Sequence, residues 1–125
     1  MMKKQINAQG APAAVGPYSH AVLAGDTLYI SGQLGLDPVT GDLQEGVEKQ
    51  AKQGFENLGV ILKEAGLTYS DVVKTTVFLA DMGDFAKVNA IYGEYFTENL
   101  PARSAVAVKE LPKGGLFEIE AIAVK

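Results

Sequence analysis

The sequence of 125 residues predicts an α/β (α+β) fold in which two helices pack on one face of a sheet of five or six strands. Apolar residues recur with a helical period in two segments, and runs rich in β-branched residues stand around them. Gly, Pro and Asp residues mark the connections. The chain is long enough for one hydrophobic core and too short for two, so we expect residues 1–125 to form a single domain.

The first part of the chain is predicted to hold two strands between two loops. Residues 8–17 are rich in Ala, Gly and Pro and are expected to form an ordered loop. Residues 19–24 and 27–33 are predicted to be strands joined by the turn Gly25-Asp26. Residues 34–46 contain DP and TGD sequences that are typical of turns.

Two helices follow from the apolar pattern. The first spans residues 47–65, and Gly66 is placed to end it. Its apolar stripe consists of Val47, Ala51, Phe55, Leu58, Leu62 and Ala65. The second helix is expected to follow the N-cap residues Asp81 and Asp84 and to end near Asn99 and Pro101. Its core face is predicted to be Phe85, Val88, Tyr92 and Tyr95 or Phe96.

Three further strands complete the order β-β-α-β-α-β-β. They are predicted at residues 72–79, 103–108 and 117–124, with Lys113-Gly114-Gly115 as a hairpin turn between the last two.

Several strands are apolar on both faces. In the strand at 72–79, alternation places Val73, Val77 and Leu79 opposite Val72 and Phe78. Two helices cover only one face of such a sheet, and soluble monomers rarely expose a large apolar patch. We therefore expect further copies of the chain, in a closed homo-oligomer, to cover the second face.

Composition excludes several function classes. The net charge of −4 argues against nucleic-acid binding, and no apolar run is long enough to cross a membrane. The N-terminal residues 1–5 are not followed by an apolar stretch, so no signal peptide is expected. Together with the absence of Cys, this predicts a cytoplasmic protein.

The residue types also limit the chemistry. With no Cys there is no thiol nucleophile and no Cys-type metal site, and with His20 as the only histidine a His-rich metal site is impossible. No metal site is therefore predicted. Ser19 and His20 are neighbours in a predicted strand and point to opposite faces, which argues against a catalytic dyad and favours a structural role for the histidine.

Arg103 and the pair Glu118 and Glu120 are the strongest candidates for chemistry. Arg103 stands at the head of an apolar strand, where its guanidinium needs a planar carboxylate, supplied either by this protein or by a substrate. Glu118 and Glu120 share one face of the last strand. They form either a solvated strand face or the border of a cavity in which a carboxylate can move a proton.

Weaker signals come from three other positions. Gly16 and Pro17 hold Tyr18 in a defined place, where it serves as packing or as a pocket wall. Ser31 stands beside a glycine at a strand end, a place where another group can approach the backbone. Asn89 is either a polar-face residue of the second helix or part of the site.

Six short motifs follow one another along the chain. They are Gly16-Pro17-Tyr18-Ser19, Ser31-Gly32-Gln33, Val73-Lys74-Thr75-Thr76-Val77-Phe78, Val88-Asn89-x-x-Tyr92, Pro101-Ala102-Arg103-Ser104 and Glu118-Ile119-Glu120-Ala121. Taken in this order, they resemble the RidA (YjgF-type) family of reactive-intermediate deaminases, and the resemblance runs from about residue 11 to the C-terminus.

The resemblance implies a chorismate-mutase-like fold with a mixed sheet, assembled as a homotrimer with active sites between subunits. It implies hydrolysis of 2-imino acids, released as enamines by pyridoxal-phosphate dehydratases, to 2-keto acids and ammonia. An imine is already electrophilic, so no cofactor is expected. By resemblance Arg103 binds the substrate carboxylate, Glu118 positions water, and Tyr18, Ser31 and Asn89 line the pocket. Ala105 replaces the Cys that many members carry, where the contact is expected to come from the backbone.

Other functions stay open at this point. The same cleft could serve a non-catalytic metabolite-binding, regulatory or chaperone-like trimer, which would bind 2-keto acids without speeding ammonia release. A ribonuclease is disfavoured by the acidic charge and the missing basic patch. Chorismate-mutase activity would need several cationic groups around a dicarboxylate, for which Arg103 alone is too little. If the last two strands form a hairpin, Arg103 and Glu118 stand at opposite ends of it, which favours a site shared between subunits.

Overall fold

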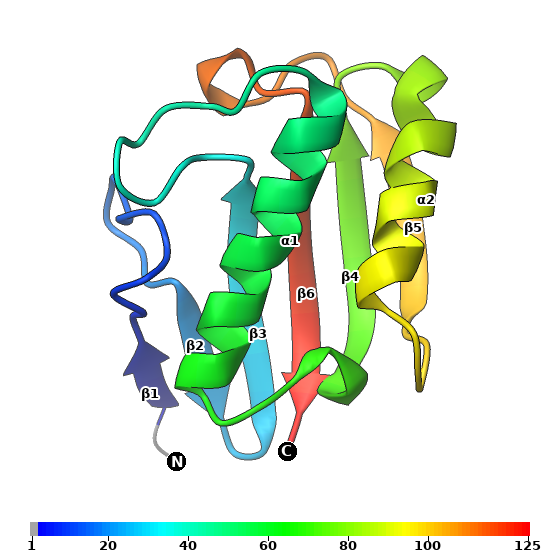
Figure 1. The fold of residues 1–125 in the computed structure, drawn as a ribbon. Coiled ribbons are helices and arrows are strands. Elements are labelled where there is room, and N and C mark those ends of the chain that lie inside the picture. The colour runs from blue at the N-terminus through cyan, green and yellow to red at the C-terminus, as the bar shows by residue number, and fades with distance from the viewer. Residues whose placement is uncertain (1–2) are drawn as a thin grey trace.

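A computed structural model describes residues 3–125 as one mixed six-stranded sheet with the order β1-β2-β3-β6-β4-β5. Both helices lie on the same face of the sheet (Figure 1). The strands are Lys3–Ile6 (β1), Ala21–Ala24 (β2), Thr27–Leu34 (β3), Val72–Leu79 (β4), Ala102–Ala107 (β5) and Phe117–Val124 (β6), and the helices are Val47–Glu64 (α1) and Phe85–Tyr95 (α2). The predicted fold class is confirmed, and every predicted helix and strand is present. The signal-peptide prediction rests partly on Met1 and Met2, which lie outside the described residues.

The edge strand β1 was not predicted. It pairs antiparallel with β2, with Lys3 opposite Ala24. Of its four residues only Ile6 is buried, so no alternating pattern marks it in the sequence. Lysines on an edge strand are one way in which proteins prevent further strand pairing.

The predicted hairpin between the last two strands is wrong. β4 lies between β5 and β6, parallel to β5 and antiparallel to β6. Residues Pro112–Gly114 form a short 3-10 turn, in which Lys113 and Gly114 take left-handed φ angles of 59° and 72°. The turn residues mark a chain reversal, as predicted. After the turn, however, the chain crosses over β4 and pairs with its other edge, so β6 is not a neighbour of β5.

α1 supplies most of the contacts between the helices and the sheet. Phe55 is fully buried, and its ring centroid lies 5.1 Å from that of Phe117 on β6 and 5.7 Å from that of Tyr92 on α2. The helix ends as predicted at Gly66, which takes a φ of 78°. The Leu67 amide then donates to the Leu62 carbonyl at 2.9 Å, the pattern of a Schellman motif.

α2 begins after a short 3-10 turn, Met82–Asp84. The Asp81 carboxylate accepts a hydrogen bond of 2.8 Å from the Gly83 amide and caps this turn, whereas Asp84 makes no side-chain cap. The prediction of N-cap chemistry is therefore right for Asp81 and wrong for Asp84. Phe96, one residue beyond the helix, is buried and completes the core face.

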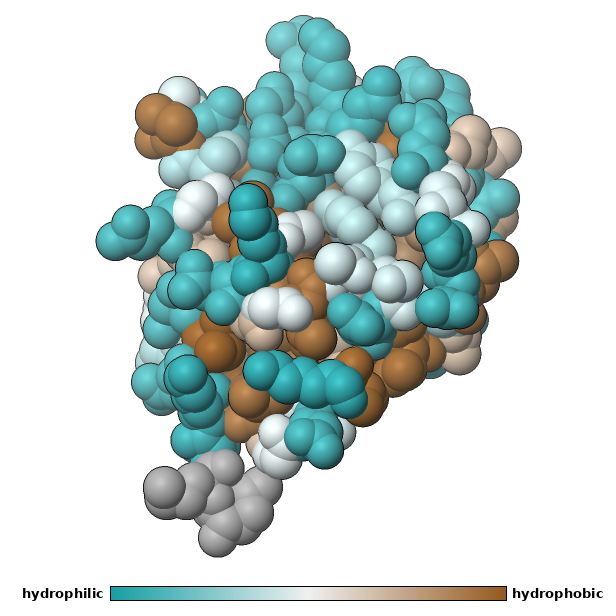
Figure 2. Space-filling model, turned by 60° about the horizontal axis from the view of Figure 1, so that its bottom comes forward, coloured by the Kyte–Doolittle hydropathy of each residue, from teal (hydrophilic) through white to brown (hydrophobic). Residues whose placement is uncertain are grey.

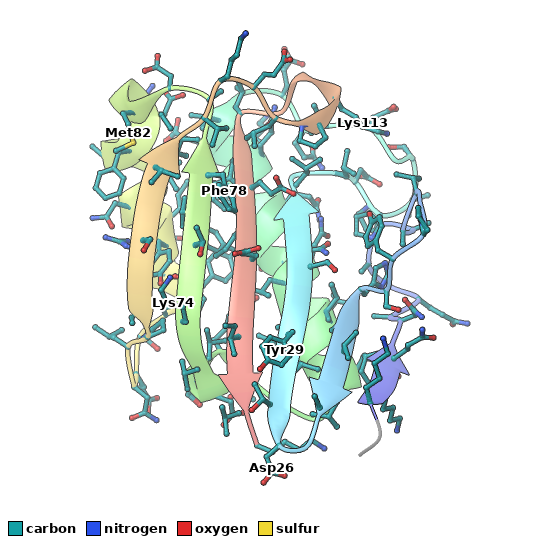
Figure 3. All side chains as sticks on the ribbon, turned by 180° about the vertical axis from the view of Figure 1, so that it is seen from behind. Asp26, Tyr29, Lys74, Phe78, Met82 and Lys113 are labelled. Atoms are coloured by element: carbon teal, nitrogen blue, oxygen red, sulfur yellow. The ribbon has the colours of Figure 1, made fainter. Side chains whose placement is uncertain are left out.

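The helix-free face of the sheet carries exposed apolar side chains, as predicted. Figure 3 looks onto this face and labels Tyr29, Lys74 and Phe78 on β3 and β4. Tyr29 is 51% exposed. A bulge between Val72 and Lys74 turns Val73 outward, so Val73 does not share a face with Val77 and Leu79 as the alternation predicted.

Polar side chains cover much of the remaining surface. Figure 2, which brings the lower end of the molecule forward, shows apolar residues exposed only in patches between hydrophilic ones. Across residues 3–125, none of the helices combines the length and apolar character needed to cross a membrane.

Candidate functional site

Arg103 lies near the start of β5, with its guanidinium over α2. Its Nη1 donates a hydrogen bond of 2.7 Å to Asn89 Oδ1, and its Cζ lies 4.7 Å from the ring centroid of Tyr92 and 5.3 Å from that of Phe85. These contacts fix the plane of the guanidinium by cation–π stacking and use one of its five N–H donors. The remaining donors can serve a ligand.

The ring beneath Arg103 is itself held in place. The hydroxyl groups of Tyr92 and Thr75 are 2.8 Å apart and form a buried hydrogen bond between α2 and β4. Burial raises the pKa of Tyr92, although its bond to Thr75 and the charge of Arg103 act in the opposite direction. The neutral ring therefore offers its face to the cation. A hollow of about 480 Å³ adjoins this group and is lined by Asn89, Tyr92, Gly93, Phe96, Leu100, Pro101 and Arg103.

Glu118 borders a separate cavity of about 240 Å³. The cavity is walled on one side by the loop that precedes β2 and on the other by β3, β6 and the turn that carries Lys113 (labelled in Figure 3). Its lining is mostly apolar and consists of Pro12, Ala13, Val15, Tyr18, His20, Gly32, Gln33, Leu34, Leu36, Pro112, Lys113 and Glu118. The Glu118 carboxylate lies directly over Gly32, where a Cβ atom would collide with it.

The two glutamates of β6 share a face of the strand but lie in different surroundings. Burial raises the pKa of Glu118, and the nearby charge of Glu120 raises it further. Glu120 is exposed and lines a different hollow, together with Tyr29 and Lys74. A half-buried carboxylate with a raised pKa beside a cavity is suited to proton transfer, and of the two only Glu118 has this setting.

Tyr18 lines the Glu118 cavity, whereas Ser31, next to Gly32 in sequence, is not among the residues that line it. The Tyr18 amide donates to the Gly16 carbonyl at 2.9 Å, and this tight turn around Pro17 brings the half-exposed Tyr18 ring to the cavity wall. The Ser31 hydroxyl donates to the Ser19 carbonyl at 2.7 Å and ties the entry of β2 to β3.

Ala105 belongs to the Arg103 side of the molecule. It is paired with Val77, stands two residues after Arg103 on the same face of β5, and packs partly buried against the core.

Arg103 and Glu118 lie on opposite faces of the sheet. Arg103 is paired with Thr75, whose buried side chain faces the helices, whereas Glu118 alternates with residues that pack under the helices and so points the other way. Glu118 is paired with Phe78, and β4 separates β5 from β6, which puts the Cα atoms of Arg103 and Glu118 roughly 14 Å apart. The candidate residues therefore form two half-sites in each chain, Arg103 with Asn89 and Glu118 with Tyr18.

Comparison with known proteins identifies the family. The family model described as Endoribonuclease L-PSP matches residues 8–125. The chain is 55% identical to the bovine 2-iminobutanoate/2-iminopropanoate deaminase over 126 residues, which cover all of this chain and 92% of that protein. The chain belongs to the RidA family. The crystal structure of RidA from an Antarctic Psychrobacter is 51% identical, with a TM-score of 0.95 and coverage of 98% of this chain and 99% of that chain. The E. coli TdcF structure with bound serine is 43% identical, with a TM-score of 0.93 and 98% coverage of both chains.

Sequence reasoning missed the residues that support the candidate groups. Phe85 and Tyr92 were predicted only as core residues, yet both also hold Arg103. Phe85 stands four residues before Asn89 and Tyr92 three residues after it, so all three lie on one stripe of the helix, and this spacing could have signalled the role. Within the described part of the chain, no group of three or more His, Cys, Asp and Glu side chains is arranged to hold a metal ion.

Proposed function

We propose that this RidA protein hydrolyses small 2-imino acids and their enamine tautomers to 2-keto acids and ammonia. The observation that carries the proposal is the half-buried Glu118, whose pKa is raised at the edge of a largely apolar cavity. The name of the bovine relative, which is 55% identical to this chain over 126 residues, supports the same reaction. The serine bound by the TdcF relative shows that a protein of this fold accepts a molecule of that size.

Arg103 is proposed to bind the substrate carboxylate. Asn89 and the Tyr92 ring hold the guanidinium in one plane, so its free donors can meet both carboxylate oxygens in a fork. Charge-assisted hydrogen bonds of this kind contribute about 1.5–3 kcal/mol each. Because the contacts already made by Arg103 are to an amide and two rings, we infer that the carboxylate it needs comes from the substrate.

Glu118 is proposed to act on water. The substrate reacts with its nitrogen protonated. As the water oxygen bonds to the imine carbon, the carboxylate takes one water proton and the electron pair of the C=N bond moves to nitrogen, which becomes a neutral amine. Glu118 then gives this proton to the amine nitrogen. As the C–N bond breaks, the hydroxyl oxygen forms the keto C=O and its proton returns to Glu118, which passes it to the departing ammonia, so that the keto acid and ammonium leave. Burial favours this double role, because a carboxylate with a raised pKa accepts a proton more readily than an exposed one.

The two half-sites are proposed to meet between subunits of a homotrimer. Within one chain the sheet separates Arg103 from Glu118, so the Arg103 half-site must face the Glu118 cavity of a neighbour. The exposed apolar residues of the helix-free face support such an assembly. In this arrangement Tyr18, Ser31 and Asn89 complete the pocket, and the backbone at Ala105 contacts the substrate.

The cell compartment and domain organisation follow from the same proposal. The substrates arise from pyridoxal-phosphate dehydratases, which fits the cytoplasmic location expected from the sequence. The half-sites draw on both ends of the chain, from Tyr18 to Glu118, so we infer that the whole chain acts as one domain.

The test couples this protein to a threonine dehydratase and follows the decay of the imine and the release of ammonia. The expected result is faster decay in proportion to the amount of this protein, with Arg103→Ala as the inactive control. A metabolite-binding protein would instead bind 2-ketobutanoate without changing the decay rate, and that outcome would overturn the proposed function.

A further inference from the structure

His20 is buried beneath the loop that forms one wall of the Glu118 cavity. It is 5% exposed, and both ring nitrogens have backbone partners: the Ala8 amide at 3.0 Å from Nδ1 and the Pro12 carbonyl at 2.7 Å from Nε2. A backbone amide only donates, so Nδ1 must accept. Nε2 therefore carries the proton and donates it to the Pro12 carbonyl. These two contacts specify the neutral Nε2–H tautomer.

The backbone of His20 completes the attachment of the same loop. Its amide donates to Asn7 Oδ1 at 3.1 Å, and its carbonyl accepts from the Ser31 amide at 2.9 Å. The imidazole thus joins the start of the loop at Ala8 to its middle at Pro12, while the His20 backbone fixes its end to β3.

The loop held in this way supplies a large part of the cavity wall. Pro12, Ala13, Val15 and Tyr18 all line the cavity opposite Glu118. Val15 is 74% exposed, so packing by its own side chain adds little to the order of this segment. Ala8 and Ala11 are buried in the core at the start of the loop, and the two hydrogen bonds of the His20 ring connect this start and Pro12 to the end of the loop, so they help to set the position of the exposed wall between them.

We propose that His20 is a positioning residue for the candidate site, through a neutral imidazole that fixes residues 8–17 and hence the place of Tyr18 relative to Glu118. The inference rests on the proposed function. Both ring nitrogens are already bonded, so His20 has no proton to offer the substrate and acts through the loop. The titratable groups that share the cavity with the ring are Tyr18, Lys113 and Glu118.

The test compares His20→Gln with His20→Leu. A Gln side chain carries one acceptor and one donor and can bridge Ala8 and Pro12, whereas Leu fills the space without either bond. We expect His20→Leu to lower kcat/KM for the imine at least tenfold and to abolish the hydrogen-exchange protection of the Ala8 amide. His20→Gln should keep that protection and stay within about threefold of the wild-type kcat/KM.

A matched control separates positioning from general destabilisation. Leu67→Ala removes a buried side chain just beyond α1, away from the cavity, and should lower the melting temperature while leaving kcat/KM unchanged. If Leu67→Ala loses as much activity as His20→Leu at equal stability, the proposal is overturned. It is overturned equally if His20→Leu stays active with the Ala8 amide unprotected, or if His20→Gln is inactive with the amide protected.

The ring itself gives a readout that does not depend on turnover. Nitrogen NMR shifts of His20 in the wild-type protein should show a protonated Nε2 and an unprotonated Nδ1. The opposite tautomer would overturn the proposal even if His20→Leu fails to fold. If the wild-type protein shows no imine hydrolysis, the proposed function fails, while the NMR and hydrogen-exchange results still decide whether His20 holds the loop.

Discussion

The separation of Arg103 and Glu118 across the sheet predicts complementation between two inactive variants. Arg103→Ala removes charge-assisted hydrogen bonds of about 1.5–3 kcal/mol each, and Glu118→Gln removes general-base assistance of about 10²–10⁴-fold. Each variant alone should therefore keep under about 1% of wild-type activity. If the two are unfolded together in equal amounts and refolded, the subunits mix at random.

The recovered activity can be calculated from the geometry. A shared site is intact only when the subunit that supplies Arg103 is the Glu118→Gln chain and its neighbour is the Arg103→Ala chain. This combination occurs at about a quarter of the sites in any closed ring of subunits. Imine hydrolysis by the mixture should therefore rise to about a quarter of the wild-type rate, far above either parent. If each site lay within one subunit, mixing would restore nothing.

A second mixture serves as the control. Equal amounts of wild-type chain and the double variant, with both substitutions in one chain, should give about a quarter of the wild-type rate for shared sites and about half for sites within one subunit. Light scattering on the same samples tests the trimer and shows whether the subunits have reassembled. A first mixture without activity, together with a second at half the wild-type rate, would refute the shared site.

Four further predictions concern single substitutions. Glu118→Gln should cut turnover strongly while 2-keto-acid binding survives, and Glu120→Gln should be milder; a deeper loss in Glu120→Gln would reverse the assignment. Because burial raises the pKa of Glu118 in the folded state, its ionised form destabilises the fold at neutral pH. Urea unfolding should therefore find Glu118→Gln more stable than wild type at pH 7, with the gain shrinking as the pH falls through the raised folded pKa of Glu118 and gone below about 4.3, the unfolded value for glutamate. Gly32→Ala should leave the fold intact but push the Glu118 carboxylate aside and lower kcat by as much as about 100-fold; unchanged kinetics would show that the carboxylate position is not critical. Arg103→Lys should recover little of the activity lost in Arg103→Ala, because an ammonium cannot reproduce the guanidinium fork, and near-normal rates would place the substrate carboxylate elsewhere.

The helices and inner strands could be predicted because their buried faces require apolar residues at regular spacings in the sequence. α1 presents a continuous apolar stripe, and Gly66 ends it in the expected left-handed conformation. β1 escaped prediction because an edge strand with one buried residue has little pattern to detect. The exposure of Val73 depends on a bulge, which adds one residue to the strand and shifts the alternation without a mark in the residue types.

The candidate site was predictable in its residues but not in its arrangement. Arg103 and Glu118 stand out because each places a charge beside apolar strand residues. Their separation onto opposite faces follows from the register, which pairs Arg103 with Thr75 and Glu118 with Phe78 on β4, and their distance follows from β4 lying between β5 and β6. Neither register nor strand order can be read from the strands themselves. A local turn sequence such as that around Lys113 specifies a reversal and not the strand on which the chain lands, so the hairpin prediction failed.

The position of β6 in the sheet affects how the protein folds during its synthesis. The last strand of the chain lies between β3 and β4, so these two strands are joined only when residues 117–124 arrive. At a synthesis rate of about 5–20 residues per second, several seconds pass between the synthesis of β3 and that of β6. During this time the edge of β3 that will pair with β6 has no hydrogen-bonding partner strand. Pairing between segments so distant in sequence is also slow to form. A chain released before residue 117 is made would hold two disconnected pieces of sheet, β1–β3 and β4–β5, each open to aggregation along the edge that β6 should have covered.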